Sequence, residues 1–297
     1  MRLAASADWH LRDDLPVCRN DVDWLEVQKK AITFVIDYAN ALKANVAITG
    51  DVFHRSHVHP SIVSMFEDAL FNYDVDDGII GILAGQHDLP YHNIDNMAKS
   101  SFGNVWKIAM SRKTHLRPME DLGLAVHFGQ LPTESYTGPK ELIFIHQLTF
   151  KTEDDMPPTD EAMLADDLLE LFPNAKWLFL GDNHHRFDYT YKGQHVINPG
   201  CLVRQSADLI DYTPGFYFVD TDSGSIEFVK VPDGGTVSND HITKEQERDE
   251  RIEAFVTSLE KGTEMSLDFV HNLRERMPSL AEGTKDVMNE MIEAIKA

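Results

Sequence analysis

The sequence contains five short apolar runs, and each run ends in a cluster of Asp, His, Gly or amide residues. The clusters are Asp8-Trp9-His10, Gly50-Asp51-Val52-Phe53-His54, Gly85-Gln86-His87-Asp88, His146-Gln147 and Gly181-Asp182-Asn183-His184-His185. The length of the runs and their content of Ile, Val, Phe and Ala are typical of buried β-strands. Helical patterns at 24–42, 61–70 and 160–171 lie between them. Strands that alternate with helices predict an α/β fold, in which ligands bind at the carboxyl ends of the strands, where every cluster falls.

The clusters are rich in the side chains that bind divalent metal ions. Carboxylate and imidazole ligands together suit Mn, Fe or Zn, and an Asp shared by two sites bridges two metals. Two cations about 4 Å apart stabilise the attacking and the leaving oxygen of a phosphoryl group, and they activate water near neutral pH. One cluster alone is more typical of a polar turn after a strand. Five clusters in order, each after a predicted strand, favour one shared metal site.

Taken in order, the clusters resemble the signature of the calcineurin-like metallophosphoesterase superfamily. The matching motifs are Asp8-x-His10, Gly50-Asp51-x-x-His54, Gly85-Gln86-His87-Asp88, His146 and Gly181-Asp182-x-His184. The resemblance spans residues 1–231, and it implies a four-layer αββα sandwich, two β-sheets flanked by helices, with two divalent metal ions. The implied metal ligands come from all five motifs: Asp8, His10 and His184 for the first metal, Gln86, His146 and Asp182 for the second, and Asp51 as the bridge.

The resemblance also gives three residues a part in the chemistry. His87 would protonate the leaving oxygen or stabilise the transition state, and Asp88 would orient His87. His54 would line the site and contact the substrate phosphate. The expected reaction is hydrolysis of a phosphodiester by hydroxide that two metals activate. Three further histidines in nearby loops are more typical of polar loop residues than of phosphate contacts: His57, His59 and His92.

Two positions depart from the superfamily pattern, and both belong to the second metal. Gln86 stands where the pattern has Asn, so its amide oxygen lies on a longer side chain and reaches a metal only if the backbone retreats. Asp182 replaces the first His of the usual Gly-His-x-His motif. Because a further carboxylate favours a harder metal, we expect Mn in preference to Zn.

Three segments point to one branch of the superfamily, the SbcD-type DNA-repair exonucleases and related phage exonuclease subunits. Asp8-Trp9-His10-Leu11 resembles their first motif, and the second motif with the following Pro60-Ser61 is similar to theirs. Residues 198–206 resemble their later Pro-Gly-Ser segment. This resemblance implies a DNA nuclease, the nuclease subunit of a repair or recombination complex similar to SbcC–SbcD. Its implied partners are DNA, a coiled-coil ATPase similar to SbcC and a second copy of the chain in a homodimer.

The sequence predicts three parts: a metallophosphoesterase core at 1–232, a linker at 233–243 and a helical appendage at 244–297. Turn-forming residues open the linker at Pro232-Asp233-Gly234-Gly235. Three apolar stripes at helical spacing follow it. The stripes either dock in a groove of a partner ATPase or pack on the core of this chain, and the sequence favours neither.

The acidic composition opposes strong binding of DNA to the bare surface. The chain has 27 Lys and Arg against 49 Asp and Glu, a net charge of -22, whereas nucleic-acid binders usually present a basic patch. Two alternatives therefore stay open. One is a small-molecule phosphodiesterase or phosphatase of the same fold. The other is a scaffold that binds a partner ATPase and has a catalytically weakened site, marked by Gln86 and Asp182.

The cysteine content and the hydropathy favour a cytoplasmic protein. Cys18 and Cys201 lie far apart and outside any metal-binding spacing, which is typical of a reducing compartment. No run approaches the roughly 20 apolar residues that span a bilayer. The first residues lead directly into Asp8 and His10, which argues against a cleaved signal peptide. We therefore expect no contact with a membrane.

Overall fold

The computed structural model describes residues 1–159, 162–240, 248, 251–252, 284–285 and 287–289. By its contacts the chain divides into two units, Met1–Ser238 and Asn239–Ala297. The helical appendage predicted at 244–297 lies almost entirely outside the described residues, so it stays a prediction, as do the predicted boundaries of the linker. Within the described part of the chain, no helix combines the length and the apolar character that a bilayer crossing requires.

A six-stranded mixed sheet carries the first three motifs. It has the strand order β13-β12-β1-β2-β3-β4, with bounds β1 (Arg2–Ser6), β2 (Asn45–Thr49), β3 (Ile80–Leu83), β4 (Leu116–Pro118), β12 (Gly215–Asp220) and β13 (Ser225–Lys230). Strands β1 to β4 are parallel, whereas β12 is antiparallel to β1 and β13 is antiparallel to β12. Successive side chains of a strand point to opposite faces, so Leu3 and Ala5 pack between the two sheets and Ala4 packs under the helices.

A five-stranded sheet carries the last two motifs. It has the strand order β10-β11-β9-β6-β5, with bounds β5 (Leu124–Val126), β6 (Leu142–His146), β9 (Trp177–Gly181), β10 (Phe187–Tyr191) and β11 (Gln194–Asn198). Only β10 runs antiparallel to its neighbour in this sheet. A separate short pair, β7 (Thr149–Phe150) and β8 (Met163–Leu164), follows the fourth motif.

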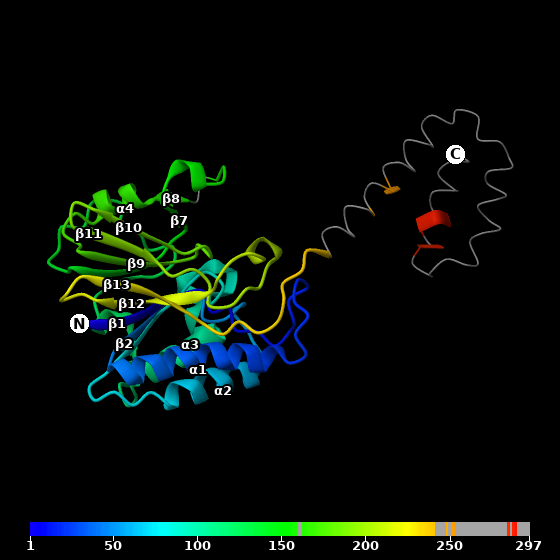
Figure 1. Ribbon diagram of the computed structural model, residues 1–297, viewed down its shortest axis with the longest axis horizontal. Coiled ribbons are helices and arrows are strands. Elements are labelled where there is room, and N and C mark those ends of the chain that lie inside the picture. Colours follow the sequence, from blue (N-terminus) through cyan, green and yellow to red (C-terminus); the bar gives the residue numbers. More distant parts are fainter. Residues whose placement is uncertain (160–161, 241–247, 249–250, 253–283, 286, 290–297) are drawn as a thin grey trace. The chain divides into compact units, whose positions relative to one another are not determined.

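Helices cover the outer face of each sheet, which confirms the predicted four-layer α/β sandwich (Figure 1). The six-stranded sheet is covered by α1 (Trp24–Leu42), α2 (Pro60–Phe71) and α3 (Ser101–Ser111), and the five-stranded sheet by α4 (Ala165–Leu171). Apolar side chains of both sheets pack together in the middle: Leu3, Ala5, Ala47, Leu83, Phe144, Phe179, Ile197, Tyr217 and Val219. In the described residues the loops contain five short 3-10 helices: η1 (Pro90–His92), η2 (Ile94–Lys99), η3 (Met119–Asp121), η4 (Glu153–Asp155) and η5 (Ala207–Leu209).

The helix predicted at 24–42 is α1 in the structure, and a cap at each end fixes its bounds. The Asp23 side chain accepts a hydrogen bond from the backbone N–H of Glu26, and Lys43 ends the helix in a left-handed conformation. The helix predicted at 160–171 is shorter than expected. It begins at Ala165, because the two residues before it pair with β7 as strand β8, and residues 160–161 lie outside the described part.

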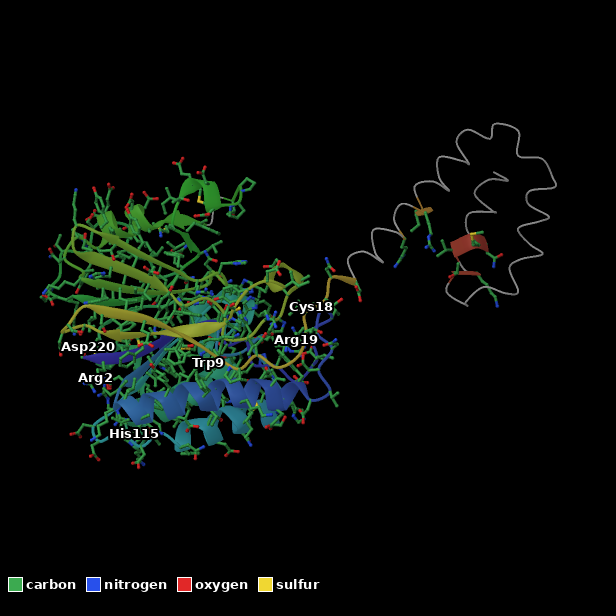
Figure 2. All side chains as sticks on the ribbon, viewed as in Figure 1. Arg2, Trp9, Cys18, Arg19, His115 and Asp220 are labelled. Carbon is green, nitrogen blue, oxygen red and sulfur yellow. The ribbon has the colours of Figure 1, made fainter. Side chains whose placement is uncertain are left out.

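A buried network of salt bridges ties the loop before α1 to the segment after β13. The side chain of Arg19, labelled in Figure 2, is 0% exposed, and it donates to the carboxylates of Asp21 at 2.7 Å and Asp233 at 3.2 Å. From the loop after β11, the backbone N–H of Arg204 also donates to Asp233 at 3.1 Å. The first residues of the predicted linker are therefore held by the first unit.

Candidate metal centre

The carboxyl ends of five strands bring the motifs to one place. Strands β1, β2 and β3 of the first sheet end there, as do β6 and β9 of the second, and His146 at the end of β6 is in register with Gly181. Thr49 at the end of β2 joins the two sheets, because its hydroxyl donates to the carbonyl oxygen of Leu180 at 2.5 Å. The clusters that the sequence predicts to share a site are therefore neighbours in space.

Three overlapping groups of side chains offer ligand atoms to a metal. Within each group the ligand atoms lie within 4.8 Å of one another: Asp8, His10 and His184; His10, Asp51 and His87; and Asp8, Asp51 and His146. Because Asp8, His10 and Asp51 each belong to two groups, the three groups form one continuous cluster. This cluster contains His87 and most of the predicted metal ligands.

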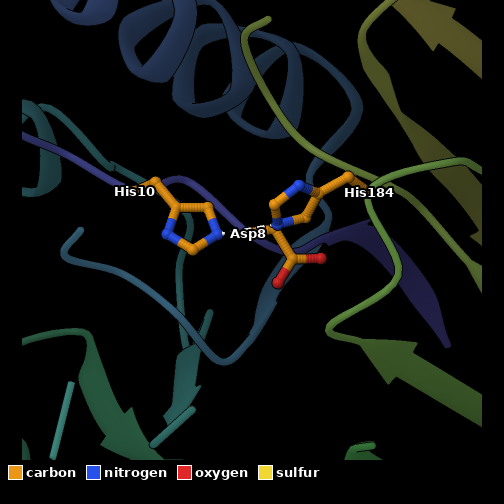
Figure 3. A group of neighbouring side chains, drawn as sticks. All are labelled: Asp8, His10 and His184. Carbon is orange, nitrogen blue, oxygen red and sulfur yellow. Dashed lines mark hydrogen bonds between the residues drawn. The ribbon is translucent and has the colours of Figure 1, made fainter. Parts of the chain in front are cut away.

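Asp8, His10 and His184 come from two separate loops and converge (Figure 3). The Nε2 atoms of His10 and His184 lie 2.9 Å apart, and the Asp8 carboxylate accepts the backbone N–H of Asp182 at 3.0 Å. Burial lowers the pKa of both histidines and raises the pKa of Asp8. The two imidazoles are therefore neutral near pH 7, which is the form that binds a metal.

Asp51 lies in the middle of the cluster. Its Oδ1 atom accepts the backbone N–H of His87 at 2.8 Å, and its Oδ2 atom lies 3.4 Å from His146 Nε2 and 3.7 Å from His10 Nε2. Among the described residues, three buried atoms of the cluster have no hydrogen-bond partner: Asp51 Oδ2, His146 Nε2 and His10 Nδ1. Two of these atoms, Asp51 Oδ2 and His146 Nε2, lie only 3.4 Å apart. Since buried polar atoms are normally hydrogen-bonded, two such potential ligand atoms side by side are typical of a metal site.

A backbone carbonyl fixes the orientation of the His146 ring. The Nδ1 atom lies 2.8 Å from the carbonyl oxygen of Thr49, which can only accept, so Nδ1 carries a proton and Nε2 faces Asp51. Two glycines make room for the ring, since a Cβ at Gly50 or Gly181 would lie 2.1 Å or 2.7 Å from Nδ1. Burial would lower the pKa of His146, but the Asp51 carboxylate outweighs burial and raises it to about 10. A bound cation would take the place of that proton.

The two residues that depart from the superfamily pattern contact each other. The amide nitrogen of Gln86 donates to the Asp182 carboxylate at 2.7 Å. The Gln86 amide thus contacts Asp182 through its nitrogen, whereas it would bind a metal through its oxygen. Asp182 is outside the three groups of convergent ligand atoms found in the described part of the chain. Both residues border the cluster, and their role as ligands of a second metal stays a prediction.

Four of the predicted ligands have strained backbone conformations. The φ angle is 49° at Asp8, 44° at His10, 48° at Asp51 and 88° at Asp182. This region costs a residue other than glycine about 1 to 3 kcal/mol. Hydrogen bonds hold the strained loops, for example from the Asp8 N–H to the Gly50 carbonyl oxygen at 3.2 Å. Strain of this kind gathers at functional sites, where the surrounding fold maintains it.

His87 belongs to the cluster, and His54 lies beside it. The His87 ring lies 4.9 Å from the ring of His10, and it stacks on the His54 ring at 5.9 Å with an angle of 10° between the planes. Burial, and then the positive charge of Arg12, lower the pKa of His54 to about 4, so this side chain is neutral at pH 7. The chemical roles of both histidines stay predictions.

The Asp88 carboxylate is hydrogen-bonded to the backbone of the second and third motifs. Its carboxylate accepts the backbone N–H groups of Val52 at 3.2 Å, Phe53 at 2.9 Å and Gly85 at 3.1 Å. In the described structure, its hydrogen bonds do not include the ring of His87. Burial raises the pKa of Asp88 to about 8. Asp88 therefore fixes the backbone of the second and third motifs, and thereby the loop that carries His87. Its role in orienting the His87 ring stays a prediction.

Two side chains outside the motifs also position the site. Gln205 donates from Nε2 to the carbonyl oxygens of Trp9 at 3.2 Å and His10 at 3.0 Å. Asn198 donates from Nδ2 to the carbonyl oxygen of Asn183 at 2.8 Å. Both belong to the segment 198–206. The resemblance of this segment to SbcD-type nucleases is the sequence feature that could have indicated their role. His92, which the sequence favours as an ordinary loop residue, has its ring 6.1 Å from that of His87.

Comparisons with known proteins leave the family of this chain open. No protein-family model and no curated protein matches the sequence. Among solved structures, the chain is similar to wild-type Vps29 from Entamoeba histolytica, crystallised with Zn²⁺, at 13% identity and a TM-score of 0.35. The match covers 78% of this chain and 98% of that chain. Since a likeness at this level shows neither family nor function, the residues of the site carry the functional inference.

Proposed function

We propose that this chain is a metal-dependent phosphodiesterase of the calcineurin-like metallophosphoesterase superfamily, and that it cleaves DNA. The proposal rests on two neighbouring buried atoms without hydrogen-bond partners among the described residues, Asp51 Oδ2 and His146 Nε2, which lie 3.4 Å apart. Such atoms destabilise a folded protein unless a cation or a hydrogen bond satisfies them. The order of the five motifs along the chain supports the superfamily.

The side chains present fit two divalent cations. Three carboxylates and three imidazoles lie in or beside the cluster: Asp8, Asp51, Asp182, His10, His146 and His184. Because the carboxylates offset much of the charge of the cations, this set favours manganese over zinc. We infer that Asp51 is the shared ligand. Bound in this cluster, the two cations would stabilise charge on the phosphoryl oxygens and activate water as the nucleophile.

His87 is the proposed donor of a proton to the leaving oxygen. Its backbone N–H is held by Asp51, and its ring is restricted by His10 on one side and His54 on the other. A general acid of this kind contributes a factor of about 10² to 10⁴ to the rate. His54 is neutral at pH 7 and is the proposed hydrogen-bond partner of a phosphate oxygen.

DNA as the substrate is supported by the segments that resemble SbcD-type nucleases. One of them, 198–206, acts on the metal site directly, because Gln205 holds the carbonyl oxygen of His10. The net charge of -22 opposes strong binding of DNA to this chain alone. We therefore propose that a coiled-coil ATPase similar to SbcC binds the segment 244–297 and contributes to DNA binding, and that the nuclease acts as a homodimer. Loss of ATPase binding on deletion of 241–297, measured with purified proteins, tests this partner.

The acidic charge favours a second candidate, a small-molecule phosphodiesterase of the same fold. A surface of this charge repels the phosphates of DNA, whereas one small diester has little charge to repel. The substrate itself separates the two functions. A nuclease degrades linear DNA or circular single strands, and a small-molecule enzyme hydrolyses a chromogenic diester and leaves both DNA substrates intact.

The experiment is a manganese-dependent assay of linear duplex DNA, circular single-stranded DNA and a chromogenic diester. Asp51→Asn should abolish cleavage, because the shared ligand loses its charge. Asp37→Asn, on the exposed face of α1, is the matched control and should cleave at the wild-type rate. Absence of cleavage of all three substrates by the wild-type chain with manganese would contradict the proposed function.

A further inference from the structure

The turn that follows the third motif has an unusual backbone. Tyr91 has φ 58° and ψ 26°, and His92 after it has φ 52°. Left-handed conformations are disfavoured for residues with a Cβ atom, and two in succession are rare without glycine. The fold maintains this strain within a few residues of the proposed acid His87, and strained backbone of this kind gathers at ligand sites.

The strained turn is anchored on both sides. Leu89 and Pro90 are buried, and the backbone N–H of His92 donates to the Leu89 carbonyl oxygen at 3.1 Å. On the far side, the Asn93 side chain caps η2 by accepting the N–H of Asp95 at 2.9 Å. Although its backbone is held, the side chain of Tyr91 is 93% exposed. The turn therefore presents an exposed aromatic side chain to solvent from a fixed backbone position.

His92 places this turn at the edge of the site. Its ring lies 6.1 Å from the ring of His87 and 6.4 Å from the ring of Phe128, which in turn lies 6.4 Å from the ring of His146. If His87 protonates the leaving oxygen, the departing group emerges beside His87. The turn at Tyr91 and His92 is therefore next to the departing group.

In DNA the departing group carries a nucleoside, whose base has an apolar flat face. Aromatic side chains bind bases by stacking, which does not depend on a basic surface and so suits a chain of net charge -22. We propose that Tyr91 stacks on the base of the departing nucleoside, and that His92 contacts its sugar or the adjacent phosphate. This inference rests on the proposed function, and it makes Tyr91 a specificity-determining residue for substrates with a base on the leaving side.

The test compares thymidine dinucleotides that have both bases with analogues in which one nucleoside is an abasic tetrahydrofuran residue. Both positions are tested, and the quantity compared is the ratio of kcat/KM for the base-bearing and the abasic substrate. For one position, the wild-type ratio should be about tenfold and should fall to about one in Tyr91→Ala, since stacking on one base stabilises binding to that extent. Tyr91→Phe, which keeps the ring, should retain the ratio. A Tyr91→Ala ratio equal to the wild-type ratio would overturn the inference.

A matched control and a binding measurement separate this inference from the proposed function. Tyr191→Ala removes another exposed aromatic side chain, 43% exposed on β10, and should keep the wild-type ratio. Binding is measured in the His87→Ala background with manganese and a 2-aminopurine trinucleotide, whose fluorescence falls on stacking. There Tyr91→Ala should raise Kd about tenfold. An unchanged Kd overturns the stacking role even if the chain cleaves DNA, and a raised Kd supports it even if the chain cleaves nothing.

Discussion

The Nε2 atom of His146 lies 3.4 Å from the Oδ2 atom of Asp51, and both atoms are buried without a hydrogen-bond partner among the described residues. His146 ends β6 of one sheet, whereas Asp51 follows β2 of the other. The pair therefore joins the two sheets at the point where the proposed cations bind.

The packing around His146 predicts that Gly181→Ala destabilises the protein. A Cβ there would lie 2.0 Å from the Thr49 carbonyl oxygen and 2.7 Å from His146 Nδ1, and overpacking against backbone should lower the free energy of unfolding by about 3 kcal/mol. Unfolding in a denaturant measures this free energy. Gly193→Ala is the control, because nothing lies within 4 Å of its Cβ and only its φ of 82° is unfavourable, which costs about 1 kcal/mol. If both variants lost the same unfolding free energy, close packing around His146 would not be the cause.

Much of the site was predictable from the sequence because its residues follow buried strands of the same α/β architecture. Asp8, Asp51 and His146 were expected at strand ends, and parallel strands bring such ends together whatever the loops between them do. The backbone contacts of Asp88 were not predictable. They involve three backbone N–H groups from two loops. Every residue except proline has a backbone N–H, so the residue types do not indicate such contacts. The same holds for Gln205, which reaches back across the chain to the first motif.

The helix boundaries show a second limit. The start of α4 depends on the pairing of Met163 and Leu164 with β7, a contact between segments that local helical spacing does not encode. Gln86 shows a third limit. In the structure its amide nitrogen donates to Asp182, a contact that the sequence does not indicate. Its role as a metal ligand stays a prediction. Which end of an amide faces a neighbour is decided by the hydrogen-bond partners that the fold supplies.

His87→Ala should reduce phosphodiester hydrolysis by a factor of about 10² to 10⁴, as expected for loss of a general acid. Manganese affinity should change far less, because the ligand cluster keeps its carboxylates and the other imidazoles. The rate is measured with a chromogenic diester under saturating manganese, and the affinity by calorimetric titration of the same protein. An unchanged rate in His87→Ala would remove this residue from the mechanism.

The buried pair of Arg19 and Asp21 predicts a pH dependence of stability. Burial raises the pKa of Asp21, but the hydrogen bond from Arg19 outweighs burial and lowers it. Because the pKa is lower in the folded protein, the stabilisation is present above the unfolded value of about 4 and is lost as the pH falls through the folded value. Asp21→Asn should lose about 2 kcal/mol of unfolding free energy at pH 7, because Arg19 loses one carboxylate partner and keeps Asp233.

Unfolding free energies between pH 3 and pH 7 measure this effect. Below pH 4 the wild-type protein should lose stability more steeply than Asp21→Asn, because the variant has no carboxylate to protonate at this position. The exposed Asp37 provides the control, and Asp37→Asn should keep the wild-type slope. Parallel slopes for the wild type and Asp21→Asn would show that the buried pair does not cause the acid sensitivity.

The most direct test of the central claim is anomalous diffraction from crystals of the full chain grown with manganese. Two anomalous peaks should lie in the buried cluster, one beside Asp8, His10 and His184 and the other beside His146, with Asp51 next to both. Crystals of Asp51→Asn should lose at least one of them. A map of the wild-type protein without a peak among these side chains would show that the cluster does not bind manganese.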